Sequence, residues 1–167
     1  GNGSQSDTTA ALIFDVHKTT LIESAIIKSN RRGDRVIDLK NSRGEIIDSR
    51  TVNVPNVPSQ INLGFEVPAG TGYSLSIGNR NPSAFVNTTG ASYPYNFGSF
   101  MTITGSNLGS SAYPFFYYMI ARELPCLSKR VEVKGYVDTS CVITDLDENK
   151  MIDDAISIYP NPANEYL

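Results

Sequence analysis

The segment Ile61-Asn62-Leu63-Gly64-Phe65-Glu66-Val67 places an apolar residue at every second position. Side chains alternate between the two faces of a strand, so this pattern predicts a β-strand with one buried face. The corner Pro68-Ala69-Gly70-Thr71-Gly72 interrupts the alternation, and Tyr73-Ser74-Leu75-Ser76-Ile77 resumes it. We therefore expect two half-buried strands on either side of a sharp turn.

Similar signals extend toward the N-terminus. Residues 11–16 and 21–27 are rich in apolar and β-branched residues, which favour strands. Residues 35–39 and 45–54 flank Asn41-Ser42-Arg43-Gly44, whose residue types suit a tight turn. The sequence thus predicts two further strands followed by a β-hairpin.

Toward the C-terminus, Phe100-Met101-Thr102-Ile103-Thr104 is strand-like, and residues 115–124 form an apolar run between two prolines. The length of that run suits a buried strand or a short helix, but its aromatic content favours a strand. Residues 129–139 alternate again and predict a final strand. Many short strands without an amphipathic helix indicate an all-β fold, an antiparallel two-sheet β-sandwich that is jelly-roll-like.

Composition restricts the class of protein. The chain has 167 residues, a net charge of -3 and an isoelectric point near 5.1, so it lacks the basic surface that nucleic-acid binding requires. No apolar run approaches the ~20 residues of a membrane span. We expect a disordered polar tail over residues 1–9, one sandwich module over 10–144 and an acidic linker over 145–155.

The last residues carry a distinctive motif. Ile156 and Ile158 lead into Tyr159-Pro160-Asn161-Pro162, where each proline fixes φ and removes a backbone donor. The pattern resembles the start of the C-terminal sorting domain of type IX secretion cargo in Bacteroidetes, although an ordinary proline-rich turn is the alternative. In that family the domain continues for several strands, so residues 156–167 are expected to be the beginning of a truncated sorting domain.

Further phrases extend the resemblance to the body of the chain. They are Phe14-Asp15-Val16, residues 67–73, Tyr93-Pro94-Tyr95, residues 101–106 and residues 126–131. Together they are similar to a β-sandwich module that precedes type IX sorting domains in secreted Bacteroidetes proteins. The resemblance implies a secreted or outer cell-surface location, the type IX secretion machinery as a partner and an accessory role. Since exported proteins meet an oxidising environment, Cys126 and Cys141 are expected to form a disulfide.

Catalytic and metal-binding residues are sparse. His17 stands two residues from Asp15, but no nucleophile motif accompanies them, so we expect no enzyme activity in this chain. Asp145, Asp147 and Glu148 are candidate calcium ligands, yet their spacing departs from that of the EF-hand loop. We expect no cofactor and no metal site, with one structural calcium ion as the alternative.

A ligand surface is indicated by Tyr93, Tyr95 and Phe97, which alternate along one extended segment. Exposed rings can stack on sugars, and Asn96 and the nearby Asn87 could hydrogen-bond hydroxyls. The alternative is that the rings cover the core, and the absence of Trp weakens the sugar interpretation. We expect a non-catalytic accessory module that binds a polysaccharide or another glycan, or mediates surface attachment. A spacer domain without a ligand and part of a hydrolase are the alternatives.

Overall fold

A computed structural model describes residues 3–6, 10–78 and 83–125 of the chain. Within these ranges it contains no helix and twelve strands. The strands are β1 (Ser4–Ser6), β2 (Ala11–Val16), β3 (Thr20–Ile27), β4 (Gly33–Lys40), β5 (Ile46–Val54), β6 (Ser59–Val67), β7 (Gly70–Ile77), β8 (Ala84–Asn87), β9 (Tyr95–Phe97), β10 (Met101–Ser106), β11 (Tyr113–Pro114) and β12 (Tyr117–Glu123). The predicted all-β class is confirmed.

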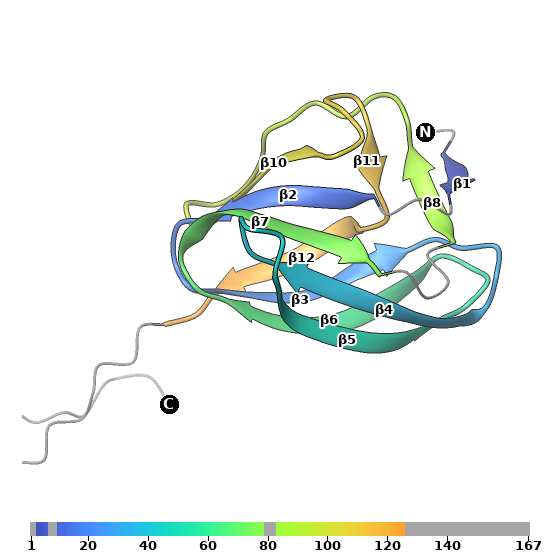
Figure 1. Ribbon diagram of the computed structural model, residues 1–167, viewed down its shortest axis with the longest axis horizontal. Helices are drawn as coiled ribbons and strands as arrows, with labels where there is room; N and C mark the ends of the chain where they lie inside the picture. The colour runs from blue at the N-terminus through green and yellow to red at the C-terminus, as the bar shows by residue number, and fades with distance from the viewer. Residues whose placement is uncertain (1–2, 7–9, 79–82, 126–167) are drawn as a thin grey trace, which may run out of the picture. The chain divides into compact units, whose positions relative to one another are not determined.

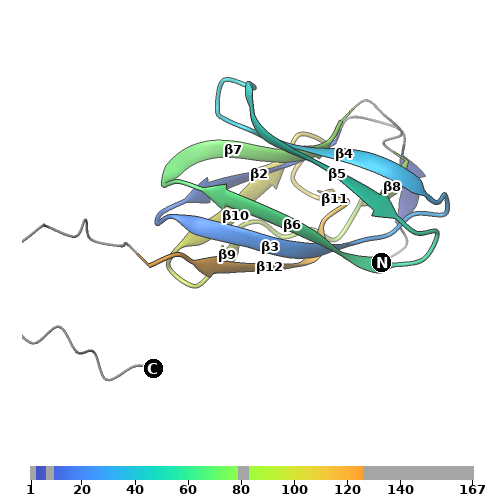
Figure 2. The ribbon, with the colours of Figure 1, turned by 90° about the horizontal axis from the view of Figure 1, so that it is seen from below.

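The strands form two main antiparallel layers. A six-stranded sheet has the order β5-β4-β7-β2-β10-β9, and a three-stranded sheet has the order β12-β3-β6 (Figure 1). Figure 2 shows β3, β6 and β12 in one layer and β2, β7 and β10 in the other. The antiparallel sandwich is thus confirmed, and a small sheet of order β1-β8-β11 is added to it.

The segment with the cleanest alternation crosses between the two layers. Ile61, Leu63, Phe65 and Val67 of β6 are all buried, as the period of two requires. β6 pairs with β3, whereas β7 pairs with β2 and β4, so the corner at residues 68–69 carries the chain from one sheet to the other. The two predicted strands therefore face each other across the core and are not hairpin partners.

The core lies between the two main sheets and is aliphatic and aromatic. Phe14 of β2 stacks on Tyr73 of β7 with ring centroids 5.8 Å apart. The fully buried side chains include Leu12, Ile22, Ile27, Ile37, Leu39, Phe65, Leu75 and Ile77. Burial of each such side chain contributes about 1.5–3 kcal/mol, so this layer of residues is the main source of stability.

The predicted hairpin is confirmed, and its turn is fixed by one asparagine. β4 and β5 pair along their whole length, from Gly33 with Val54 to Lys40 with Ile46. At the turn, the Asn41 Oδ1 atom accepts hydrogen bonds from the backbone N–H groups of residues 43 and 45, at 2.9 and 3.0 Å. An Asx interaction of this kind explains why asparagine suits the position.

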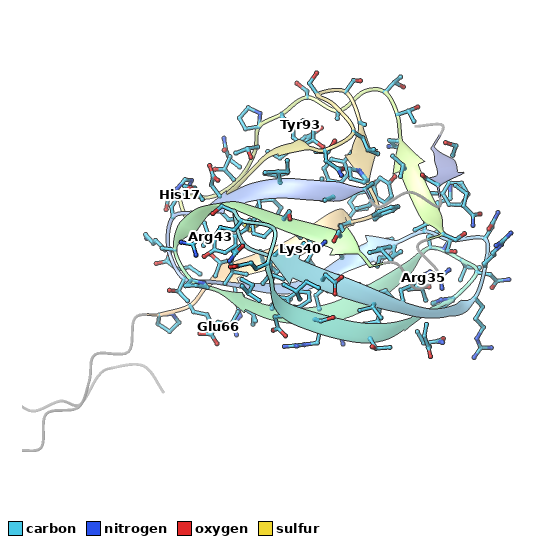
Figure 3. All side chains as sticks on the ribbon, viewed as in Figure 1. His17, Arg35, Lys40, Arg43, Glu66 and Tyr93 are labelled. Atoms are coloured by element: carbon cyan, nitrogen blue, oxygen red, sulfur yellow. The ribbon has the colours of Figure 1, made fainter. Side chains whose placement is uncertain are left out.

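One charged side chain is completely buried. Arg35 of β4 has no exposed surface, and its guanidinium donates to the backbone carbonyls of Gly33 (2.6 Å), Arg31 (2.7 Å) and Ser83 (3.1 Å) and to the Ser29 hydroxyl at 3.0 Å (Figure 3). Burial lowers the pKa of Arg35, and the Asp34 carboxylate raises it. Arg35 therefore joins the β3–β4 connection to the residue just before β8.

The N-terminal residues differ in part from the expected disordered tail over residues 1–9. Ser4–Ser6 form β1, which pairs antiparallel with β8 from Ser4 opposite Val86 to Ser6 opposite Ala84. Strand pairing uses backbone groups, so a polar segment can complete an open sheet edge without apolar side chains. Composition alone could not reveal this pairing.

Several sequence-based predictions lie outside the described residues. They are the strand over residues 129–139, the Cys126–Cys141 disulfide, the calcium candidates Asp145, Asp147 and Glu148, the linker over 145–155, and the sorting segment with Tyr159, Pro160, Asn161 and Pro162. Among the residues that are described, no helix is long and apolar enough to cross a bilayer.

Candidate ligand-binding pocket

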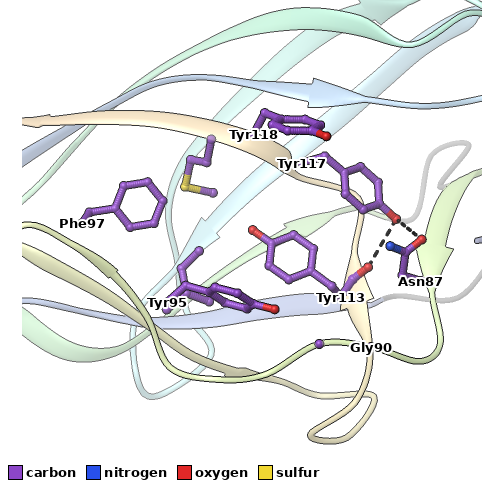
Figure 4. A pocket seen from close by; sticks show the side chains of 10 residues that line it. Asn87, Gly90, Tyr95, Phe97, Tyr113, Tyr117 and Tyr118 are labelled. Atoms are coloured by element: carbon purple, nitrogen blue, oxygen red, sulfur yellow. Dashed lines mark hydrogen bonds between the residues drawn. The ribbon is translucent and has the colours of Figure 1, made fainter. Parts of the chain in front are cut away.

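A pocket opens on the flank of the sandwich where an edge strand of each main sheet lies. β9 is the last strand of the six-stranded sheet, and β12 is the first strand of the three-stranded sheet. The pocket has a volume of about 360 Å³ (Figure 4). We call it the aromatic pocket, and it is lined by Asn87, Gly90, Ala91, Tyr95, Phe97, Ile103, Tyr113, Tyr117, Tyr118 and Met119.

Four tyrosines form a packed cluster at and behind the pocket wall. The ring centroids of Tyr93 and Tyr95 are 5.3 Å apart, and those of Tyr95 and Tyr113 are 5.6 Å apart, both in edge-to-face contact. Tyr113 also stacks on Tyr93 at 6.2 Å and lies 5.7 Å from Tyr117. These separations are typical of favourable aromatic pairs. The tyrosine cluster is thus a rigid wall.

The hydroxyl groups of the tyrosine cluster are used inside the protein. Three of them donate to backbone carbonyls, and the fourth accepts a backbone N–H. The bonds run from Tyr93 to the Ala112 carbonyl (2.6 Å), from Tyr113 to the Phe116 carbonyl (3.1 Å), from Tyr117 to the Phe85 carbonyl (3.1 Å) and from the Ser92 N–H to the Tyr95 hydroxyl (2.9 Å). Each ring is therefore fixed in orientation as well as in position.

Burial raises the pKa of three phenols of the tyrosine cluster. It raises the pKa of Tyr113 strongly, and the neighbouring tyrosines Tyr93, Tyr95 and Tyr117 act in the same direction. Burial also raises the pKa of Tyr93 and of Tyr117, in each case against a smaller opposing effect of a hydrogen bond. The raised pKa values keep the phenols of Tyr93, Tyr113 and Tyr117 protonated near neutral pH, so this wall presents aromatic surface and uncharged hydroxyls.

The opposite wall is built from a backbone segment with unusual geometry. Phe115 and Tyr118 have positive φ angles of 58° and 46°, which cost non-glycine residues about 1–3 kcal/mol each. The register of β12 against β3 also shifts between Tyr117 and Ile120. Phe115 is fully buried, whereas Tyr118 is 83% exposed. The buried part of the segment thus holds Tyr118 out at the pocket rim.

The four residues that the sequence predicted as one ligand surface do not all line the aromatic pocket. Tyr95 and Phe97 line the aromatic pocket, and Tyr93 packs behind Tyr95. Asn96 lies on the other face of β9, where its Oδ1 atom accepts a hydrogen bond from the Thr102 hydroxyl at 3.1 Å. Since neighbouring residues of a strand point to opposite faces, Asn96 cannot accompany Tyr95 and Phe97 into one site.

Apart from Asn87, the other lining residues were not predicted. Tyr117, Tyr118 and Met119 belong to the run over residues 115–124 that we predicted, correctly, to contain a strand, whereas Tyr113 precedes that run and lies in β11. Periodicity did not indicate that β12 borders β9 across the pocket. Asn87 of β8, which the sequence indicated as a hydrogen-bonding group beside Asn96, does line the pocket, and its Oδ1 atom lies 3.4 Å from the Tyr117 hydroxyl. Pairing of distant strands, which periodicity does not reveal, brings these residues together.

The other candidates from the sequence do not join this pocket. Asp15 accepts the backbone N–H of Gly72 at 2.7 Å, where the register of β2 against β7 shifts. The His17 Nε2 atom lies 3.2 Å from the Thr102 hydroxyl, outside the aromatic pocket. Within the described part of the chain, no three His, Cys, Asp or Glu side chains are grouped as metal ligands would be.

The aromatic pocket can hold a ligand with flat apolar faces and few polar contacts. Its lining contains no carboxylate, imidazole, thiol or amine among the described residues. No protein-family model, curated protein or solved structure matches this chain. What bears on function is therefore the geometry of the pocket itself.

Proposed function

We propose that this chain is a non-catalytic accessory module of a secreted or cell-surface protein and that it binds carbohydrate in the aromatic pocket. The observation that supports the proposal is the combination of Tyr95, Phe97 and Tyr118 around one cavity with the polar Asn87. The C–H faces of a sugar ring pack on aromatic rings, while its hydroxyls need a small number of hydrogen-bonding groups.

The volume of the aromatic pocket and the exposure of Tyr118 favour a ligand-binding site over a set of rings that only covers the hydrophobic core. The volume of about 360 Å³ lies in the range of small-molecule sites, which is roughly 300–1,000 Å³. Tyr118 is 83% exposed, so its ring contributes little to the core. A residue held at a strained φ without a packing role is more readily explained by a function than by stability.

The same lining supports a role without catalysis. General acid–base chemistry needs a titratable group within hydrogen-bond reach of the substrate. In the described chain the ionisable groups of the aromatic pocket are the phenols of Tyr95, Tyr113, Tyr117 and Tyr118. Burial raises the pKa of Tyr113 and Tyr117, which moves both away from the range in which they could transfer protons at neutral pH.

A spacer without a ligand is the second candidate, and one observation favours it. The hydroxyls of Tyr93, Tyr95, Tyr113 and Tyr117 are all bonded within the protein, so the tyrosine cluster also serves as packing. In that case Tyr118 would have no role in binding. The two candidates differ in whether any glycan binds at all.

The decisive experiment is a glycan array followed by calorimetry on the best ligand. Removing the Tyr118 ring (Tyr118→Ala) or the Phe97 ring (Phe97→Ala) should each weaken binding about tenfold, which is a loss of about 1.4 kcal/mol. The matched control is Ile46→Ala on β5, an exposed apolar residue (58%) outside the pocket lining. Unchanged affinity in the double variant of Tyr118 and Phe97 would place the ligand elsewhere, and an array without any bound glycan would favour the spacer.

The export route is a separate proposal that rests on the resemblance of the tail. Tyr159, Pro160, Asn161 and Pro162 would form the start of a signal read by the type IX secretion machinery. The test is a reporter fused to the parent protein in a type IX-competent host. Loss of export after removal of residues 156 onward supports the proposal, and unchanged export contradicts it.

A further inference from the structure

A second pocket adjoins the aromatic pocket. Its volume is about 280 Å³, and Asn87, Tyr117 and Tyr118 line both pockets. The exposed ring of Tyr118 therefore stands between the two cavities (Figure 4 shows it at the edge of the first). A ligand longer than one sugar ring could occupy both pockets and contact Tyr118 where they meet.

The second pocket differs from the first in carrying a charge. Lys28 lines it together with Phe85 and Pro58, and Lys28 is the single charged side chain in the described lining of either pocket. Its Nζ atom lies 4.5 Å from the centroid of the Phe85 ring. This cation–π contact limits the movement of the ammonium group while its N–H donors stay available to a ligand.

The Lys28 charge has no carboxylate partner among the described residues. The ion pairs there join Lys18 to Glu123, Arg50 to Asp48 and Arg122 to Glu23. Neither pocket is lined by Asp or Glu. The aromatic pocket is thus uncharged. The second pocket carries the positive charge of Lys28, which no carboxylate in the described lining neutralises.

We propose that the two pockets form one groove for an acidic oligosaccharide, with sugar faces on Tyr95, Phe97 and Tyr118 and a uronic acid carboxylate at Lys28. This inference rests on the proposed carbohydrate binding and names the class of glycan. A carboxylate carries a single charge, which one lysine matches, and because Lys28 is exposed we expect a gain of only about threefold to fivefold over a neutral sugar. Since the two pockets adjoin, an oligosaccharide can occupy both of them, whereas a monosaccharide fills only one.

The test compares acids with their own methyl esters, because esterification removes the charge and leaves the sugar skeleton unchanged. Tetrasaccharides of galacturonate and of mannuronate, each as free acid and as methyl ester, are titrated into the full chain by calorimetry. We expect a free acid to bind about threefold to fivefold more tightly than its ester at low salt. The difference should disappear at roughly 1 M salt, where the Debye length is about 3 Å.

Two variants locate the charge effect. Lys28→Gln should abolish the preference for the acid and leave the affinity for the ester unchanged. Lys40→Gln, which alters a lysine outside both pockets, should retain the preference. The monosaccharide acid should bind at least about tenfold more weakly than the tetrasaccharide, since it can reach only one pocket.

Each contrary result has a definite meaning. Equal binding of acid and ester, or a preference that survives Lys28→Gln, overturns the acidic-glycan assignment and leaves neutral carbohydrate binding in place. Stronger binding of a sulfated tetrasaccharide overturns the choice of a carboxylate, and equally tight binding of a poly-glutamate peptide shows that charge alone is recognised. If no glycan binds, acidic or neutral, both this inference and the proposed function fail.

Discussion

The two halves of the sandwich obtain their order in different ways. In residues 11–77, aliphatic and aromatic side chains alternate into the core, and Phe65, Leu75 and Ile77 have no exposed surface. In residues 84–123, which we call the aromatic flank, half-buried tyrosines are fixed by hydroxyl hydrogen bonds and two residues take positive φ angles. The first half stabilises the fold mainly by burial. The second half adds buried residues such as Met101 and Phe116 to the core, and it also holds aromatic rings around a cavity.

Removing a core ring should produce the largest effect. Phe65→Ala deletes a fully buried side chain from β6, and such changes cost about 3–5 kcal/mol because a cavity remains. Phe97→Ala in the aromatic flank removes a half-buried ring that borders an existing cavity, so we expect about half that loss. Urea denaturation of both variants measures the difference. Equal losses would contradict the division of the molecule into a stabilising and a binding half.

Arg35 tests how the two halves are joined. Arg35→Ala should lower the free energy of unfolding by about 3 kcal/mol, because the Gly33 carbonyl loses its side-chain donor and the carbonyls of Arg31 and Ser83 keep only the Ser29 hydroxyl. Arg35→Met restores most of the volume but no donor, so it should not recover the loss. Arg32→Ala, at an exposed neighbour, should stay within about 0.5 kcal/mol of the parent. Full recovery by methionine would show that packing, and not hydrogen bonding, is what Arg35 supplies.

The regular half could be predicted from sequence because its signals are local. The alternation of residues 61–67 marks the buried face of β6, and Asn41 and Gly44 mark the turn of the hairpin. The partner of each strand could not be predicted in this way. Nothing in the corner at residues 68–69 indicates that β6 and β7 join different sheets.

The candidate site was only partly predictable for the same reason. The alternation of Tyr95 and Phe97 correctly placed both rings on one side of β9, and it also implied that Asn96 faces away. Tyr118 reaches the site through a positive φ and a register shift of β12 against β3, and neither feature leaves a signal in the local periodicity of the sequence. The residues that depend on non-local geometry are those that the sequence could not assign.

Alkaline pH should lower the free energy of unfolding through the buried Tyr113 of the aromatic flank. Burial raises the pKa of Tyr113, whereas in the unfolded chain a tyrosine has a pKa of about 10. Below pH 10 both states hold the proton and the stability is complete. Above pH 10 the unfolded state loses the proton first, so this one group lowers the free energy of unfolding by up to ~1.4 kcal/mol per pH unit.

The comparison that isolates Tyr113 is the pH dependence of Tyr113→Phe. The variant loses the hydroxyl bond to the Phe116 carbonyl at every pH, which is a constant offset measured at pH 8. Between pH 9 and 11 its stability should then decline by about 1 kcal/mol less than that of the parent. Parallel pH profiles in urea denaturation would show that Tyr113 does not titrate differently in the two states.

The smallest effect, and the most specific one, is expected at Tyr118. Glycine inside a strand usually costs about 0.5–1 kcal/mol relative to alanine. At the φ of 46° held by Tyr118 the order should reverse, because glycine adopts positive φ freely while alanine retains a strain of about 1–2 kcal/mol. We therefore expect Tyr118→Gly to be more stable than Tyr118→Ala by about 0.5–1 kcal/mol, as measured by urea denaturation.

Ile120 supplies the matched control on the same strand. It is 48% exposed and does not have a positive φ, so Ile120→Gly should be less stable than Ile120→Ala in the usual order. Both Tyr118 variants should lose glycan affinity to the same extent, since both lack the ring. A reversed stability order together with equal loss of binding would show that the strained backbone serves to present the ring. The usual order at both positions would mean that the segment relaxes in solution and that the pocket wall is not held by strain.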